Sequence, residues 1–374
     1  MAAQAIRVPF VDLAPVNLPL RDELLAGFAT LLERGNFGGG PEVESFEGAF
    51  AAYCGAARCV GTASGLDALR LGLLASGLEP GDEVIVPANT FVATFEAVVQ
   101  AGGTPVAVDV SEVDYNLDVE AATAAVTART RFLLPVHLYG QMADMRAIRR
   151  LAERRGLRIV EDACQAHGAE RDGLRAGACG TAAAFSFYPA KNLGAAGDAG
   201  ALVTDDDAIA DLARALRQHG EVEKYRSVRS GYTARLDSMQ AIVLGCKLPL
   251  LDGWNAERVE AAAFYDSGLA GVGDLRLHPR APGSTPVWHL YVVRSARREE
   301  LEAHLAAQGI ATGRHYPEPP HLSEAFGWLA GGVGSFPVTE ALAEELLSLP
   351  LFPGIEREQL EAVVAAIRAF FGDG

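Results

Sequence analysis

The chain has 374 residues, 49% of them hydrophobic and 21% charged, which fits a large, well-cored protein with one big α/β domain and a smaller one. Its formal net charge of -16 argues against nucleic acid or an anionic membrane as the main partner, because both need clustered lysine and arginine. Five cysteines without a CxxC pair indicate reduced thiols rather than a disulfide framework, and they make a zinc site improbable.

The N-terminal ten residues lack the basic start and long apolar core of a signal sequence. Further along the chain, no stretch approaches the roughly 20 uninterrupted apolar residues that a membrane span needs. We therefore expect a cytoplasmic protein without a membrane partner.

Short apolar segments alternate with longer amphipathic ones through the first 250 residues, the pattern of a mostly parallel sheet covered by helices on both faces. A helix is expected to start near Gly65, after a turn of small residues, and another to cover 144–155. The expected strands cover residues 83–86, 104–108, 132–136, 158–161, 183–187 and 201–204.

After residue 250 the character of the chain changes, because prolines punctuate short strands and two helical patterns follow, at 299–308 and 356–371. We expect a large domain over 1–250, which includes the N-terminal segment, and a smaller α+β domain over 251–374.

Lys191 lies in a polar, glycine-containing turn directly after an apolar strand. A lysine placed there can form a Schiff base with a carbonyl cofactor. Upstream, the strand at 158–161 leads into Asp162 and Gln165, which could hold the nitrogen and the phenolic oxygen of a pyridine ring. Together these residues indicate pyridoxal 5'-phosphate (PLP). Taken singly, Asp162 could equally cap the next turn, and Gln165 could be an ordinary turn amide.

Three further features support the same cofactor, each with a structural alternative. The helix N-terminus at Ser64, Gly65 and Leu66 is a ready site for a phosphate. Ser186 could donate to that phosphate, although a strand serine is more often structural. Phe91 could stack on the ring, although such an aromatic is usually part of the core.

Several ordered blocks of the chain closely resemble the DegT/DnrJ/EryC1/StrS family, the PLP-dependent sugar aminotransferases of the aspartate aminotransferase (fold type I) superfamily. The matching blocks are residues 8–13, 65–69, 81–87, 135–140, 161–163, 197–201, 235–241 and 314–317. The resemblance implies that Lys191 is the Schiff-base lysine and proton shuttle and that Asp162 holds the pyridine nitrogen. It also implies Gln165 on the ring oxygen, Ser186 on the phosphate and Phe91 against the ring.

Two positions depart from the commonest family pattern. Leu66 stands where many members have Thr, so that only backbone N–H groups remain for the phosphate at this position. Thr233 stands where many members have an Asn that reaches the phosphate of the neighbouring subunit, and threonine has the shorter reach. The resemblance also implies a homodimer whose active sites span the interface.

Substrate contacts are expected at a second set of residues. His315 and His321 flank a proline-rich loop that in the family faces the sugar nucleotide, and Tyr316 lies within it. Lys224 and Arg235 are candidates for the diphosphate. The expected residues are Tyr188, Lys224, Arg235, His315, Tyr316 and His321. The histidines lack zinc-ligand spacing, so packing or substrate contacts are favoured over a metal site.

The resemblance implies transamination between L-glutamate or L-glutamine and a nucleotide-linked, dTDP-type keto-deoxysugar, in antibiotic or other secondary-metabolite sugar biosynthesis. The segment around Lys191 resembles members that act at C-3 of the sugar, because members that act at C-4 commonly carry His in place of Tyr188. The alternatives are a C-4 aminotransferase and a cyclitol aminotransferase of the scyllo-inosose type. Lys191 counts against a sugar dehydratase, which resembles the family with His at this position, and against a non-catalytic regulator.

Overall fold

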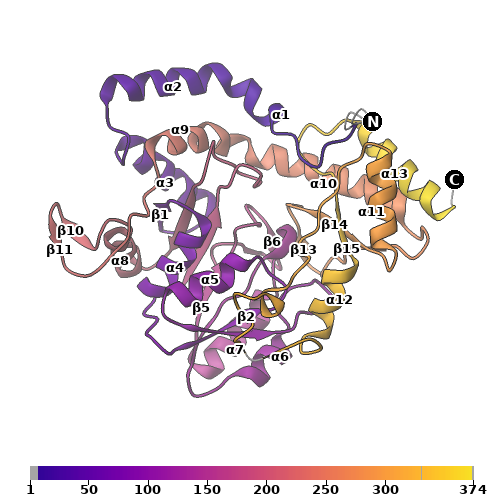
Figure 1. Cartoon of the computed structure of the whole chain (residues 1–374). Coiled ribbons are helices and arrows are strands. Elements are labelled where there is room, and N and C mark those ends of the chain that lie inside the picture. Colours follow the sequence, from indigo (N-terminus) through magenta and orange to yellow (C-terminus); the bar gives the residue numbers. More distant parts are fainter. Residues whose placement is uncertain (1–6, 330, 373–374) are drawn as a thin grey trace.

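A seven-stranded sheet forms the centre of the computed structural model, which describes residues 7–329 and 331–372 (Figure 1). β9 alone runs antiparallel to its neighbours, and the other strands are parallel to one another. In spatial order the strands are β1 (Arg58–Thr62), β9 (Gly200–Thr204), β8 (Ala182–Ser186), β5 (Arg158–Asp162), β4 (Thr130–Leu133), β2 (Glu83–Pro87) and β3 (Thr104–Val108).

Both faces of this sheet are buried, because successive strand residues point to opposite sides. Ile159 packs in one apolar cluster, whereas the next residue, Val160, packs in another on the opposite face. The first face is covered by α3 (Pro41–Cys54), α6 (Val119–Ala125), α7 (Met145–Arg155) and α9 (Ser238–Lys247). The second is covered by α4 (Gly65–Ala75), α5 (Val92–Gln100) and α8 (Asp207–Arg217). The expected mostly parallel sheet with helices on both faces is therefore present.

A third apolar cluster is built mainly from the last third of the chain and packs beside the sheet domain. Val8 belongs to this cluster and forms a parallel bridge with Ile310, so the N-terminal segment contacts the C-terminal part of the chain. Its main elements are α10 (Leu251–Leu269), β12 (Arg276–Leu277), β14 (Tyr291–Arg294), α11 (Arg298–Ala307), β15 (Leu346–Leu349) and α13 (Arg357–Phe371). A domain boundary near residue 250 stays a prediction.

The remaining elements lie at the edges. α2 (Arg21–Arg34) runs over α9 and follows the short helix α1 (Ala14–Asn17), and the hairpin of β10 (Glu221–Glu223) and β11 (Arg226–Ser227) projects from the opposite end to α13 (Figure 1). Others are β6 (Glu170–Arg171), β7 (Leu174–Arg175), β13 (Ser284–Thr285), α12 (Pro337–Glu345) and the 3₁₀ turns at Leu18–Leu20, Leu138–Gly140, Leu248–Leu250 and Pro320–Leu322. Among the described residues, no helix is long and apolar enough to cross a bilayer.

Most predicted elements are present, with small shifts at their ends. The predicted strand at 132–136 ends at Leu133, and the segment after it is held by a single bridge between Val136 and Asp162. The predicted strand at 183–187 is one residue earlier. β1 was not predicted, because its five residues include an arginine, a glycine and a threonine and give no clear apolar pattern.

Candidate active site

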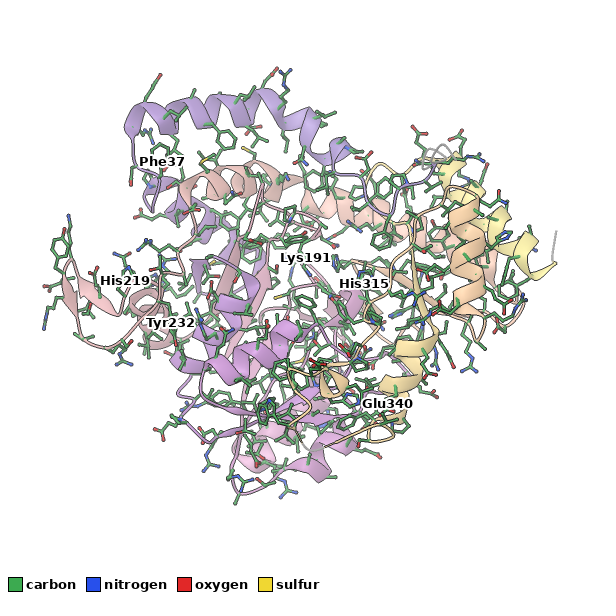
Figure 2. The ribbon with its side chains drawn as sticks, viewed as in Figure 1. Phe37, Lys191, His219, Tyr232, His315 and Glu340 are labelled. Carbon is green, nitrogen blue, oxygen red and sulfur yellow. The ribbon has the colours of Figure 1, made fainter. Side chains whose placement is uncertain are left out.

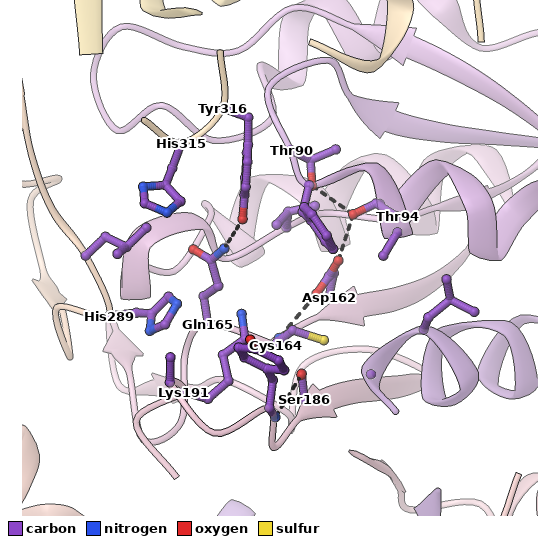
Figure 3. A pocket seen from close by; sticks show the side chains of 18 of the residues that line it. Thr90, Thr94, Asp162, Cys164, Gln165, Ser186, Lys191, His289, His315 and Tyr316 are labelled. Carbon is purple, nitrogen blue, oxygen red and sulfur yellow. Dashed lines mark hydrogen bonds between the residues drawn. The ribbon is translucent and has the colours of Figure 1, made fainter. Parts of the chain in front are cut away.

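A cavity with a volume of about 440 Å³ lies at the carboxyl ends of β5 and β8, where parallel sheets commonly place their ligands. Loops from the C-terminal part of the chain close its other side (Figure 3). Eleven of the predicted residues line it: Ser64, Gly65, Leu66, Phe91, Asp162, Gln165, Ser186, Tyr188, Lys191, His315 and Tyr316.

Lys191 is positioned by a tight turn that follows β8. Its backbone N–H donates to the carbonyl of Tyr188 at 2.8 Å, and the Lys247 ammonium donates to the Gly194 carbonyl at 2.7 Å. Burial lowers the pKa of the Lys191 amine below its ordinary value, and the nearby Asp162 carboxylate only partly offsets this. A lowered pKa raises the fraction of neutral amine, the form that acts as nucleophile and base.

Asp162 is the last residue of β5 and is held by two donors. Its Oδ2 accepts from the Thr94 hydroxyl at 2.8 Å, and its Oδ1 accepts from the Cys164 backbone N–H at 3.2 Å. Thr94 is itself 2.7 Å from the Thr90 hydroxyl (Figure 3). These bonds fix the carboxylate in one orientation at the cavity wall, as a partner for a ring nitrogen requires.

The N-terminus of α4 forms another part of the wall. Ser64 caps it, because its Oγ accepts from the Asp67 N–H at 3.0 Å. The N–H groups of Gly65 and Leu66 are the first two of the helix and have no intrahelical acceptor, so they can bind an anion together with the helix dipole. A Cβ on Gly65 would lie 2.7 Å from the Ser186 Cβ and 2.8 Å from the Cys164 Sγ. The close packing of α4 on β8 therefore requires glycine here.

Aromatic side chains and an amide line a further side. The rings of Phe91 and Tyr316 are 5.3 Å apart, and half of the Phe91 side chain is exposed toward the open cavity. Gln165 Nε2 donates to the Tyr316 hydroxyl at 3.1 Å, and its Oε1 accepts from the Tyr139 N–H at 2.7 Å. The His315 carbonyl accepts from the Tyr139 hydroxyl, which ties this loop to the sheet domain.

Four predicted site residues do not line this cavity: Lys224, Thr233, Arg235 and His321. Lys224 is exposed on the β10–β11 hairpin, and Thr233 Oγ1 lies 3.3 Å from the His219 ring. Figure 2 shows His219 on the hairpin side of the molecule, apart from Lys191. His321 is buried and lies 3.4 Å from the Glu340 carboxylate, so within this chain it makes a packing contact.

Several residues that line the cavity were not predicted from the sequence, among them Phe10, Thr94, Cys164 and Arg258. His289 lines the cavity as well. Thr90 and Thr94 carry a helical i, i+4 spacing that places both hydroxyls on one face, which is a signal that could have been read. Arg258 gives no such signal, because its position beside the cavity depends on how α10 packs.

The donor set fits PLP. A fixed carboxylate, a helix N-terminus with two free N–H groups and an amine of lowered pKa all border one cavity, together with an aromatic ring. Lys191, Lys224 and Lys247 are the only lysines in the sequence, and Lys191 alone lines this cavity.

The profile of the DegT/DnrJ/EryC1/StrS aminotransferase family matches residues 20–368. The chain belongs to this family. The predicted aminotransferase class and PLP cofactor are thereby confirmed.

Two relatives are similar over nearly the whole chain. A dTDP-3-amino-3,4,6-trideoxy-alpha-D-glucose transaminase from Streptomyces venezuelae is 50% identical over 366 residues, which cover 98% of this chain and 97% of the relative. The erythromycin biosynthesis sensory transduction protein EryC1 from Saccharopolyspora erythraea is 48% identical over 362 residues, which cover 97% of this chain and 99% of the relative.

Two solved structures share the fold. DesV from S. venezuelae superposes with a TM-score of 0.95 at 50% identity and covers 97% of this chain and 98% of its own. NtdA from Bacillus subtilis, solved with bound cofactor PMP, superposes with a TM-score of 0.91 at 32% identity. The match covers 99% of this chain and 86% of NtdA.

Proposed function

We propose that this enzyme transfers an amino group from L-glutamate or L-glutamine to C-3 of a dTDP-linked keto-deoxysugar, in the biosynthesis of an amino sugar for a secondary metabolite. The observation that carries the proposal is the cavity in which Lys191 and the fixed Asp162 carboxylate meet the free N-terminus of α4. The 50% identity to a transaminase named for a 3-amino sugar supports the carbon and the nucleotide.

When bound, PLP supplies an electron-accepting ring and carries the amino group between the two substrates. Asp162 would hold its ring nitrogen, Gln165 its phenolic oxygen, and the α4 N–H groups with Ser186 its phosphate. Lys191 Nζ would remove the proton from Cα of the amino acid and pass it to the cofactor carbon that receives the amino group, within the same half-reaction. The second half-reaction runs these transfers in reverse on the sugar, so we expect ping-pong kinetics.

The sugar nucleotide is expected on the side of Tyr188, His315 and Tyr316. Tyr188 is 55% exposed at the cavity and lies three residues before Lys191, so its hydroxyl is free to meet a bulky substrate. The open aromatic side chains here suit a flat base or sugar face.

We also propose a homodimer with shared active sites. Lys224 and Thr233 lie away from the cavity of their own chain, near a projecting hairpin that exposes Val222, Tyr225 and Val228. Exposed apolar side chains on such a projection fit burial against a second copy. Lys224, Thr233 and Arg235 would then serve the cavity of the neighbouring subunit.

The test runs the reaction backwards. dTDP-3-amino and dTDP-4-amino deoxysugars are added separately to the PLP form with 2-oxoglutarate, and cofactor absorbance and glutamate release are followed together. We expect turnover with the 3-amino sugars alone. Turnover with only the 4-amino sugars would move the reaction to C-4, and turnover with only an aminocyclitol would replace the nucleotide sugar. A Lys191→Ala protein that keeps its biological activity would indicate a regulator.

A further inference from the structure

His289 lies beside Lys191 at the cavity, on the side opposite Thr94 (Figure 3). It is 9% exposed and follows Trp288, whose φ is +47°. The buried Arg258 guanidinium holds this stretch of backbone, since its Nη1 donates to the carbonyls of Trp288 at 3.2 Å and His289 at 3.4 Å. The position of the imidazole is therefore fixed from behind.

Two buried amides, those of Asn255 and Asn192, determine which nitrogen of the His289 ring carries the proton. Asn255 Nδ2 donates to the His167 carbonyl at 2.9 Å, which leaves Asn255 Oδ1 as an acceptor. Asn192 Nδ2 donates to that oxygen at 2.8 Å and to the Val287 carbonyl at 2.9 Å. Neither amide can be flipped without setting oxygen against oxygen, so the Asn192 oxygen must face His289.

The hydrogen bonds of these two amides determine the tautomer of His289. The Asn192 oxygen lies 3.2 Å from His289 Nδ1, so Nδ1 must carry the proton and donate it. Burial, with the nearby Lys191 as a smaller cause, holds the pKa of His289 well below its ordinary value, so the ring stays neutral. His289 Nε2 is then an unprotonated acceptor, on a ring that lines the cavity next to a lysine.

We propose that His289 is a positioning residue whose Nε2 accepts a hydrogen bond from the Lys191 amine whenever that amine is free, and so directs it for proton transfer. The inference rests on the proposed transamination, in which Lys191 is released and reused in each half-reaction. A lysine amine on a flexible four-carbon stem gains most from such a fixed acceptor. A neutral imidazole can serve it without repelling its positive charge.

The kinetic test compares His289→Leu with His289→Gln, whose amide oxygen restores an acceptor near the position of Nε2. The two half-reactions are measured separately in single turnovers of the holoenzyme, with glutamate and with the 3-amino sugar. Misplacing a reacting group by about 1 Å lowers the reaction rate on the order of 10²-fold. We therefore expect His289→Leu to slow both half-reactions by a similar factor, of that order. The glutamine variant should recover most of the loss.

A loss confined to one half-reaction would overturn the proposal, because His289 would then contact that substrate instead of Lys191. Equal rates in the leucine variant and the parent would overturn it as well. His304→Leu serves as the matched control, since His304 is on α11, bonds the Ala366 carbonyl and does not line the cavity.

The tautomer can be read without any substrate, which separates this inference from the proposed function. In the ¹⁵N-histidine-labelled holoenzyme, the signal that disappears in His289→Gln belongs to His289, and we expect it to show a protonated Nδ1 and an unprotonated Nε2. Asn192→Ala should release the ring to a mixture of tautomers. A protonated Nε2 in the parent would contradict the proposal even if transamination is confirmed. Conversely, failure of the parent to transaminate would not change the measured tautomer of His289.

Discussion

Gly65→Ala tests whether the N-terminus of α4 holds the cofactor phosphate. The new Cβ would lie 2.7 Å from the Ser186 Cβ, 2.8 Å from the Cys164 Sγ and 3.2 Å from the Ser186 Cα. Carbon atoms in contact are normally about 3.5–4.0 Å apart, so the first turn of the helix must move away from β8. Overpacking of this kind costs about 1–3 kcal/mol of folding stability.

The same movement displaces the Gly65 and Leu66 N–H groups from the anion that they face. Hydrogen bonds to a charged group contribute about 1.5–3 kcal/mol, so the loss of this alignment corresponds to about 10- to 100-fold weaker PLP binding. Fluorescence titration of the cofactor-free protein with PLP measures the affinity, and urea unfolding measures the stability separately.

Gly48→Ala is the control for this experiment, because Gly48 is in the interior of α3 and a Cβ there meets no atom within 4 Å. Alanine in an exposed helix interior should stabilise by about 0.5–1 kcal/mol and leave PLP binding unchanged. A folded Gly65→Ala protein that binds PLP as tightly as Gly48→Ala would refute the assignment of the phosphate to α4.

Three further predictions concern other parts of the site and its surroundings. Lys191→Arg should abolish both half-reactions in rapid-mixing assays while PLP still binds, because a guanidinium stays protonated; residual turnover in either half would count against Lys191 as the base. Phe91→Leu should weaken PLP binding up to about tenfold by titration, the equivalent of about 0.5–1.5 kcal/mol for an aromatic contact, and an unchanged affinity would place its ring elsewhere. His278, whose pKa burial lowers to about 4, stays neutral in the folded protein while the unfolded chain binds a proton below its ordinary 6.5. The free energy of unfolding should therefore fall as the pH drops from 6.5 to 4, and His278→Phe should reduce that fall by roughly 2.5 kcal/mol in urea titrations at several pH values. An identical pH dependence in the variant and the parent would contradict a neutral, buried His278.

The parts of the site that follow the ends of strands were predictable from the sequence. Asp162 and Lys191 come directly after apolar segments, and Ser64 precedes a helical pattern, so that local rules place all three at one edge of the sheet. The support for these residues was not predictable. Thr94 reaches Asp162 only because α5 packs on the sheet, and Asn192 meets Asn255 and His289 across long separations in sequence.

The residues that were expected in the site but lie outside it show another limit of local reasoning. Thr233 and Lys224 were placed by resemblance alone, and nothing in their own sequence neighbourhood indicates where they lie relative to the cavity. β1 was missed because its pairing with β9, which is distant in sequence, decides its structure.

We propose above all that Lys191 carries the cofactor. Borohydride reduction of the PLP form fixes the cofactor to the amine that holds it, and peptide mass spectrometry then identifies the residue. The sequence offers only Lys191, Lys224 and Lys247. We expect the added mass on the peptide that contains Lys191 and its loss when the holoenzyme is first converted with L-glutamate. Label on Lys224 or Lys247, or an active enzyme without label on Lys191, would contradict this account.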